Sequence, residues 1–391
     1  MKTPPSRDVR LQLDPARDLL PSGKRLSGGM SAAAAFDGAL WLVHDETVFV
    51  EQLSATRTRA GTLAYGAHQR YDLRRFLSLA ATAPEKGSTA PPEADLEGLA
   101  YADGYLWLAG SHSAQRDGPE GKRGAAGIAG LATVTRSGNR FLLARIPVAN
   151  GSDGAPALAR RAQPAGADAP RVAARLPGGR KQDALTRALR DDPHLGPFLP
   201  IPSKDNGVDI EGLAAAPGGR LFLGLRGPVL DGWACIVEIH VAPNRRRPDE
   251  LELVKLPRDG GARPALARYR KHFLELGGAG VRDLCISGRD LLILTGPPMR
   301  GKGTTKLRLW PDALATRSER MLDHRQLPTL LELPYHAKKD HAEGITVLAR
   351  AGSRALVMVL YDSADATRRL PPAAMNATVH DLALAPSRPA R

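Results

Sequence analysis

Carboxylate pairs spaced two residues apart recur along this 391-residue chain, each at the start of an apolar segment. Asp95 and Glu97 begin one such segment, and Asp209 and Glu211 begin another. In a β-strand, side chains at positions i and i+2 lie on the same face, so both acids of a pair would point the same way. Oxygen-only ligands favour calcium or magnesium. The metal ligands that we predict are Asp95, Glu97, Asp209, Glu211, Asp283 and Glu343.

A purely structural role would explain the same acids. A carboxylate at the start of a strand can accept hydrogen bonds from backbone N–H groups of a neighbouring strand. The glycine that follows Glu97, Glu211 and Glu343 permits a tight backbone path at that point. From the sequence, both alternatives are open for each acid.

Basic and imidazole side chains are placed in the segments next to these acids. Cations beside carboxylates suit an anionic ligand bridged by a metal ion, as in phosphate-ester chemistry, although solvated ion pairs would look the same. The segment RGKGTTK (300–306) lacks the spacing of a phosphate-binding loop, and no catalytic nucleophile is predicted. The ligand-binding residues that we predict are His44, His112, Arg226, Lys302 and His341.

The acids belong to a hairpin pattern that the chain repeats five times. Each copy has a strand of small and apolar residues, a turn with Gly, Asp or Ser, and a strongly apolar strand. Repeats built only of strands are typical of a β-propeller. The copies lie at residues 28–46, 95–113, 209–228, 281–298 and 340–363.

Two further strand-like segments follow most copies, which gives the four strands of a propeller blade. Only one, 377–385, follows the last copy, so we expect residues 8–13 to supply the missing outer strand and close the ring. The predicted fold is all-β, a single β-propeller domain over 1–391 with five blades, and six or seven blades are alternatives. Other segments predicted as strands are 127–135 and 250–256.

Two insertions enter just before inner strands, so we expect helical insertions on one face. The insertion 150–204, rich in Ala, Pro, Gly and Arg, is predicted to be partly flexible with a helix over 181–192. A second helix is predicted over 262–276. The long loops between second and third strands leave from the same face, so the functional site is expected there.

The composition restricts the partners and the compartment. The net charge of +14 would attract acidic partners, but the arginines are scattered and form no stripe with aromatic residues, so we do not expect nucleic acid as a partner. No apolar run approaches a membrane span, and the N-terminus lacks a signal-peptide pattern. We therefore expect a cytoplasmic protein without a membrane partner; a misassigned start would leave export open.

The motifs DLEGLA, DIEGLA, LRGP, GPP and HAEGIT resemble an uncharacterised bacterial family, a domain of unknown function presumed to be a β-propeller. The likeness runs from about residue 27 to 362. More distantly, the D-x-E-G starts are similar to those of esterase-like phytases, which implies phosphate-ester hydrolysis. The first copy lacks the acid, however, and Asp283 is not followed by Glu-Gly.

These observations lead to two functional expectations. The first is that the loop-rich face binds a divalent cation, calcium or magnesium, together with an anionic small molecule such as a phosphate ester, which it would hydrolyse if the protein is an enzyme. The alternative is a non-enzymatic module that binds a protein or a carbohydrate. Propellers serve many functions, so the fold alone favours neither.

Overall fold

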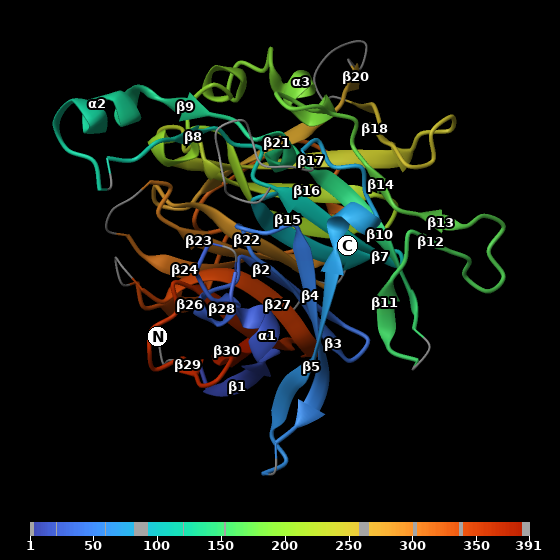
Figure 1. Ribbon diagram of the computed structural model, residues 1–391. Helices are drawn as coiled ribbons and strands as arrows, with labels where there is room; N and C mark the ends of the chain where they lie inside the picture. The colour runs from blue at the N-terminus through green and yellow to red at the C-terminus, as the bar shows by residue number, and fades with distance from the viewer. Residues whose placement is uncertain are drawn as a thin grey trace.

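The computed structural model describes residues 4–20, 22–58, 60–81, 93–119, 121–151, 154–257, 266–299, 303–335 and 339–384. Over these residues the chain is mostly β, in several antiparallel sheets (Figure 1). The helices are short, and none of those described has the length and apolar character needed to cross a membrane. They are α1 (Pro15–Asp18), α2 (Gly124–Ala132), α3 (Ala184–Leu189) and the 3-10 helices η1 (Leu26–Gly28), η2 (Leu73–Arg75), η3 (Gly138–Arg140), η4 (Gly196–Phe198), η5 (Ser203–Asp205) and η6 (Ala313–Ala315).

The described strands form five units, and each unit has at its centre four strands that lie side by side in a sheet. The innermost strand of each unit packs against the innermost strand of the next, and the last packs against the first, which gives a propeller-like ring. These five strands are β2 (Ala32–Phe36), β6 (Leu96–Ala102), β15 (Asp209–Ala216), β22 (Gly280–Ser287) and β27 (His341–Ala351).

The remaining strands extend each unit outward. The first unit adds β3 (Ala39–Val43), β4 (Phe49–Arg57) and β5 (Leu63–Asp72); the second adds β7 (Tyr105–Gly110), β10 (Leu143–Asn150), β11 (Pro156–Leu158) and β14 (Ala174–Arg175). The third adds β16 (Arg220–Gly227), β17 (Trp233–Pro243), β18 (Leu251–Leu253), β21 (Arg270–Glu275) and β25 (Arg320–Leu322). The fourth adds β23 (Asp290–Gly296), β24 (Thr305–Trp310) and β26 (Thr329–Leu333), and the fifth adds β28 (Arg354–Asp362), β29 (Arg369–Leu370), β30 (Ala374–Ala383) and β1 (Ser6–Gln12).

The second strand of each hairpin supplies much of the core. Every residue of β3 (ALWLV) and of β7 (YLWLAG) is buried, including Trp41 and Trp107. Continuous apolar runs of this kind fit strands that are covered on both faces by neighbouring sheets. This burial explains why the second strand is the most apolar part of each sequence repeat.

The N-terminal strand completes the last unit, as the sequence predicts. β1 pairs antiparallel with β30 from Ser6 opposite His380 to Gln12 opposite Ala374. It also makes a short parallel pairing with β5 of the first unit, through Arg10 opposite Ala64. β1 thus connects the fifth unit with the first, and it covers the edges of β30 and β5.

One predicted helix is present and the other is wrong. α3 lies inside the predicted 181–192 helix, where the Asp183 side chain caps its first turn. Within the described part of 262–276, the chain instead forms β20 (Leu266–Ala267) and β21. β21 pairs along β17, and two of its basic side chains, Arg270 and His272, meet the buried carboxylate of Glu238. This cross-strand pairing overrides the helix-like pattern of the sequence.

Two predicted strands are also corrected. Residues 124–132 form helix α2 rather than a third strand, and β10 takes the third position in the second unit. In the third unit β18 only extends the edge of β17, and β21 is the fourth strand. The remaining short strands are β8 (Gln115–Arg116), β9 (Val134–Thr135), β12 (Arg161–Ala162), β13 (Arg171–Val172) and β19 (Leu256–Pro257).

The insertion 150–204 forms no additional blade in its described residues. Its strands β11 and β14 pair with β10, while β12 and β13 pair with each other. In Figure 1, α3 of this insertion and α2 both lie towards the top of the view. The described chain therefore has no sixth four-stranded unit.

Candidate functional site

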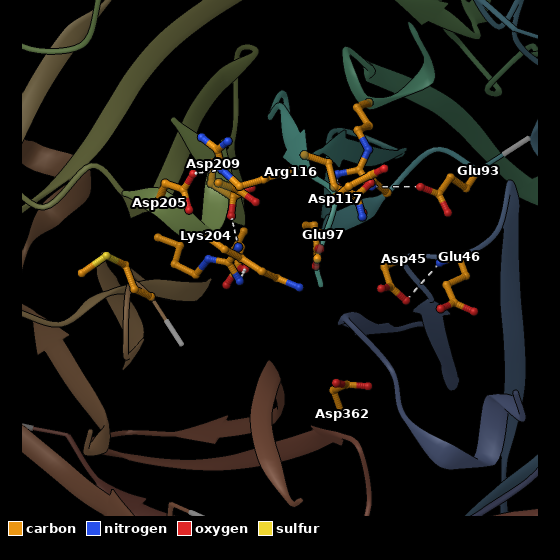
Figure 2. Close-up of a pocket in the computed structure, with 18 of the residues that line it drawn as sticks. Asp45, Glu46, Glu93, Glu97, Arg116, Asp117, Lys204, Asp205, Asp209 and Asp362 are labelled. Carbon is orange, nitrogen blue, oxygen red and sulfur yellow. Dashed lines mark hydrogen bonds and ion pairs between the residues drawn. The ribbon is translucent and has the colours of Figure 1, made fainter. Parts of the chain in front are cut away.

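An acid-lined cavity of about 730 Å³ lies at one end of the ring of inner strands. Its walls come from the starts of inner strands, the ends of second strands and the loops beside them, which is the loop-rich face that the sequence predicts as the site. Figure 2 shows Glu97 in the middle of the group, with Asp45 and Glu46 on one side and Asp209 on the other. Acidic side chains outnumber basic ones in this lining, although the whole chain is basic.

Three glutamates reach the cavity because each occupies a β-bulge. In the second unit Leu96 pairs with Gly110 and Gly98 pairs with Ala109, so Glu97 is an extra residue between two regular pairs. Glu211 and Glu343 occupy the same position in their own hairpins. Bulges re-aim side chains and are common next to functional sites.

In the fourth unit an arginine takes the bulge position. The register shift lies between Val281 and Asp283, so Arg282 corresponds to the bulge glutamates and Asp283 to the glycine that follows them. At Gly98 a Cβ atom would lie 2.5 Å from Cβ of Leu213, so this position touches the next unit. The sequence motif places Asp283 in line with the bulge glutamates, but the strand pairing shows that Asp283 lies one residue after the bulge position.

Asp283 is buried and accepts backbone hydrogen bonds. Its Oδ1 accepts from the N–H of Leu284 and its Oδ2 from the N–H of Ile345 in the next unit, both at 2.7 Å. It does not line the cavity. For Asp283 the geometry matches the structural alternative better than the predicted metal role.

Two arginines hold three of the predicted acids. Arg282 Nε lies 2.9 Å from Oε2 of Glu211, and its Nη2 contacts Oε1 of Glu343. Arg226 Nη1 lies 2.5 Å from Oε1 of Glu211, and its Nη2 contacts Oδ2 of Asp209. Arg226 was predicted to bind an anion, but its charge is engaged with these two carboxylates.

Arg140 forms the corresponding ion pair with Asp95. Its Nη1 lies 2.5 Å from Oδ2 of Asp95, and its Nη2 lies 2.9 Å from Oε1 of Glu93. The same guanidinium also donates to Ser113 Oγ at 3.3 Å and to Gln115 Oε1 at 3.2 Å. Asp95 is therefore fixed in place at the cavity wall.

Glu97 differs from the other acids. Across the described ranges, no hydrogen bond or ion pair links its carboxylate to another residue. Burial and the nearby charges of Asp95 and Glu211 raise the pKa of Glu97 well above its usual value. Burial likewise raises the pKa of Asp209 to about 7, in spite of Arg226. Perturbed carboxyl groups in a cavity are typical of binding or catalytic sites.

A mixed group of ligand atoms lies in the fifth unit. His341, Glu343 and Asp362 each offer one atom, and these atoms all lie within 4.8 Å of one another. His341 and Asp362 are paired across strands β27 and β28, and Glu343 is on the bulge two residues further. Thus the structure brings His341 and Glu343, both predicted, next to an acid that the prediction did not include.

The other predicted ligand residues are dispersed. His44 is buried, and its Nδ1 lies 2.8 Å from Oδ1 of Asp45. Burial alone would lower the pKa of His44, but the contact with Asp45 outweighs it and raises the pKa. His112 contacts Asp183 through Nε2 at 3.0 Å and lines a separate pocket of about 210 Å³. Lys302 is outside the described residues.

Sequence reasoning missed four important residues: Asp45, Asp362, Arg140 and Arg282. Asp45 follows the second strand β3 in VHDE, and Asp362 is the last residue of the second strand β28 in LYDS. Both could have been found by comparing the sequences that leave the hairpins. Arg282 stands directly before Asp283 and is recognised only once the bulge register is known. Arg140 is the last residue of the short 3-10 helix η3 before β10, and no repeat signal marks it.

Comparison with known proteins connects the chain to one family and to remote structures. No curated protein matches it. Similar solved structures include the glutaminyl cyclase of Myxococcus xanthus, with 10% identity and a TM-score of 0.37 over 96% of this chain and 97% of that chain. A glycosyl hydrolase from Bacteroides ovatus has 11% identity and a TM-score of 0.28 over 93% of this chain and 86% of that chain. These likenesses are too low to transfer an activity.

The sequence-family match is far more extensive. The model of one family matches residues 29–378, which include all five inner strands and every acid of the cavity wall described above. The chain belongs to this family, described as a protein of unknown function (DUF3616).

Proposed function

We propose that the cavity binds a divalent cation, calcium or magnesium, through Glu97 and its neighbouring acids. The observation that carries this proposal is the carboxylate of Glu97, which lines the cavity beside Asp95 and Asp45 and has no hydrogen-bond or ion-pair partner among the described residues. A bound cation would neutralise Glu97 in the way that Arg140 neutralises Asp95 and Arg226 neutralises Asp209. Carboxylate oxygens are the ligands that calcium and magnesium prefer.

An anionic ligand is the second part of the proposal. Basic side chains occupy the same lining as the acids: Lys24, Arg116 and Lys204. Arg116 Nε lies 2.6 Å from Oδ2 of Asp205, and Lys24 contacts Glu46, so both can exchange an acidic partner for a ligand. A cation at Glu97 would offset the negative cavity and let a phosphate ester bind across these groups. The distant likeness of the D-x-E-G starts to esterase-like phytases makes hydrolysis of such an ester the activity to test.

Direct titration of the purified full chain tests the cation site. We expect calcium or magnesium binding by isothermal calorimetry, and at least tenfold weaker binding by Glu97→Gln. Glu252→Gln, which changes an exposed glutamate outside the cavity, is the matched control. Equal affinity in the wild type and Glu97→Gln would reject the proposed ligand. Release of nitrophenol from p-nitrophenyl phosphate, with and without the metal, then tests hydrolysis separately.

A second candidate is a binding module for a basic peptide. Helix α2 and its surroundings expose apolar side chains: Ile128 is 72% exposed and Leu131 is 46% exposed. Leu131 also lines the cavity, as does Met299, so apolar and acidic surfaces are continuous. Acidic clefts attract cationic partners over a distance. Binding of a fluorescent lysine-rich peptide that is weakened in Leu131→Ser, while metal binding is unchanged, would favour this candidate.

A further inference from the structure

We infer that His341, Glu343 and Asp362 form a second metal site, selective for a transition-metal ion such as Mn²⁺ or Zn²⁺. This inference rests on the proposed function, because it assigns a second ion to the same cavity. The three ligand atoms lie within 4.8 Å of one another, close enough for a single ion to contact all of them. The inclusion of an imidazole distinguishes this group from Glu97 and the carboxylates beside it, which offer oxygen ligands alone.

The donor set decides the class of metal. Imidazole nitrogen suits zinc and related transition ions, whereas magnesium and calcium take oxygen ligands. One imidazole with two carboxylates is therefore expected to prefer Mn²⁺ or Zn²⁺ over Ca²⁺. Three protein ligands also leave coordination positions free, as in metal sites that bind a water or a substrate.

The backbone holds the three ligands in one geometry. His341 and Asp362 face each other across an antiparallel pair, and Glu343 projects from the bulge on the same strand as His341. All three side chains are partly exposed, and Glu343 and Asp362 line the cavity. An ion at this position would therefore be reachable from the solvent and from a ligand in the cavity.

Outer contacts orient each ligand. The ring of Tyr335 stacks on His341 with centroids 5.5 Å apart and an angle of 13° between the rings. Ser363 Oγ lies 2.9 Å from Oδ2 of Asp362, and Arg282 contacts Oε1 of Glu343. Such second-layer contacts fix the ligands of metal sites and reduce the cost of ordering them. Arg282 also contacts Glu211, so it connects this group with the rest of the cavity wall.

Calorimetric titration of the full chain with MnCl₂ or ZnCl₂ tests the inference. We expect the wild type to bind one of these ions, and His341→Ala to bind it at least tenfold more weakly. His324→Ala is the matched control, because His324 is an exposed histidine paired with Glu275 and does not line the cavity. Asp362→Asn serves as an independent variant if His341→Ala does not fold.

The outcome is separable from that of the proposed function. Glu97→Gln should lose calcium or magnesium binding but keep the affinity for Mn²⁺ or Zn²⁺. No binding of Mn²⁺ or Zn²⁺ by the wild type, or wild-type affinity in His341→Ala and Asp362→Asn, would overturn the inference. Equal loss of Mn²⁺ or Zn²⁺ binding in Glu97→Gln and His341→Ala would also overturn it, because the two groups would then form a single site.

Discussion

Glu97 is a carboxylate whose ionisation works against folding. Burial and the nearby acids raise its pKa above the 4.5 of an ordinary glutamate, so ionised Glu97 is disfavoured in the folded state. Below pH 4.5 Glu97 is protonated in both the folded and the unfolded state, so its ionisation does not affect stability. The free energy of unfolding falls as the pH rises above 4.5 and through the folded-state pKa of Glu97. Glu97→Gln should therefore raise the unfolding temperature at pH 8 in the absence of metal, and leave it nearly unchanged at pH 4. Glu97→Gln should thus stabilise the metal-free protein and also weaken cation binding. Such a trade-off between stability and activity is common at functional sites.

Thermal unfolding monitored by circular dichroism at both pH values checks this prediction. Glu252→Gln is the control, since Glu252 lies on an exposed strand edge and should show no such pH-dependent gain. An equal effect of Glu97→Gln at pH 4 and pH 8 would contradict the electrostatic explanation.

Arg282 is the cation on which two glutamates depend. Arg282→Met would leave Glu211 with Arg226 alone and remove the arginine contact of Glu343. Removing one partner of a buried ion pair leaves uncompensated charge, so we expect a loss of about 3 kcal/mol in the free energy of unfolding. Urea denaturation at pH 7 measures this. Arg282→Lys should be intermediate, because an ammonium group keeps the charge but lacks the fork that reaches both acids. Full stability of Arg282→Met would refute this role.

The sequence identified the acids of the site better than their partners. Asp95, Glu97, Asp209 and Glu211 were found because the same D-x-E spacing recurs at equivalent strand starts. The cations that hold them do not recur at a fixed spacing. Arg140, for example, belongs to the 3-10 helix η3, far along the chain from Asp95. Ion pairing between distant segments depends on the folded arrangement, which no local pattern encodes.

The glycine after each bulge glutamate serves the packing between neighbouring units. A Cβ at Gly98 would lie 2.5 Å from Leu213 Cβ, and one at Gly212 would lie 2.9 Å from Leu284 Cγ. Gly98→Ala should therefore force the inner strands apart and cost about 2 kcal/mol of unfolding free energy, the size typical of overpacking. Gly179→Ala is the control, because no atom lies within 4 Å of a Cβ there. Chemical denaturation of both variants provides the comparison, and equal stability would show that the close approach is not limiting.

At the scale of elements, the hairpins were predictable and their connections were not. The turn residues and the buried second strands β3 and β7 have strong local signals. The sequence of α2, GAAGIAGLA, favours a strand because it has small and apolar residues without a clear helical face. The local sequence of β21 favours a helix, because the pairing with β17 that makes it a strand involves residues more than thirty positions apart. Local propensity is a weak guide where such distant pairing decides the structure.

Closure by the N-terminal strand should be important for the stability of the whole molecule. Val9 and Leu11 of β1 are buried, whereas Arg7 on the same strand is exposed. Leu11→Ala removes a fully buried side chain and should destabilise the protein by about 3 kcal/mol. Arg7→Ala should have almost no effect. If differential scanning calorimetry shows equal melting temperatures for the two variants, β1 does not contribute to the cooperative core.

The charge of the whole molecule is misleading about its site. A net charge of +14 suggested an anionic partner, yet acids predominate in the central cavity. The net charge of the whole chain therefore does not indicate the charge of the cavity, whereas the acids at the repeated strand starts do. Long-range attraction of an anion and local binding of a cation are compatible at different distances, because surface charges act over about 10 Å at moderate salt.

Thermal unfolding of the wild type and Glu97→Gln, first in EDTA and then with calcium or magnesium restored, tests whether the cavity binds a divalent cation. A ligand that binds only the folded state stabilises it by about 2.7 kcal/mol at a hundredfold excess over its Kd. We expect a clear rise in the wild-type melting temperature with metal and little or no rise in Glu97→Gln. No rise at millimolar metal, or the same rise in both proteins, would contradict the claim that Glu97 and its neighbours bind a divalent cation.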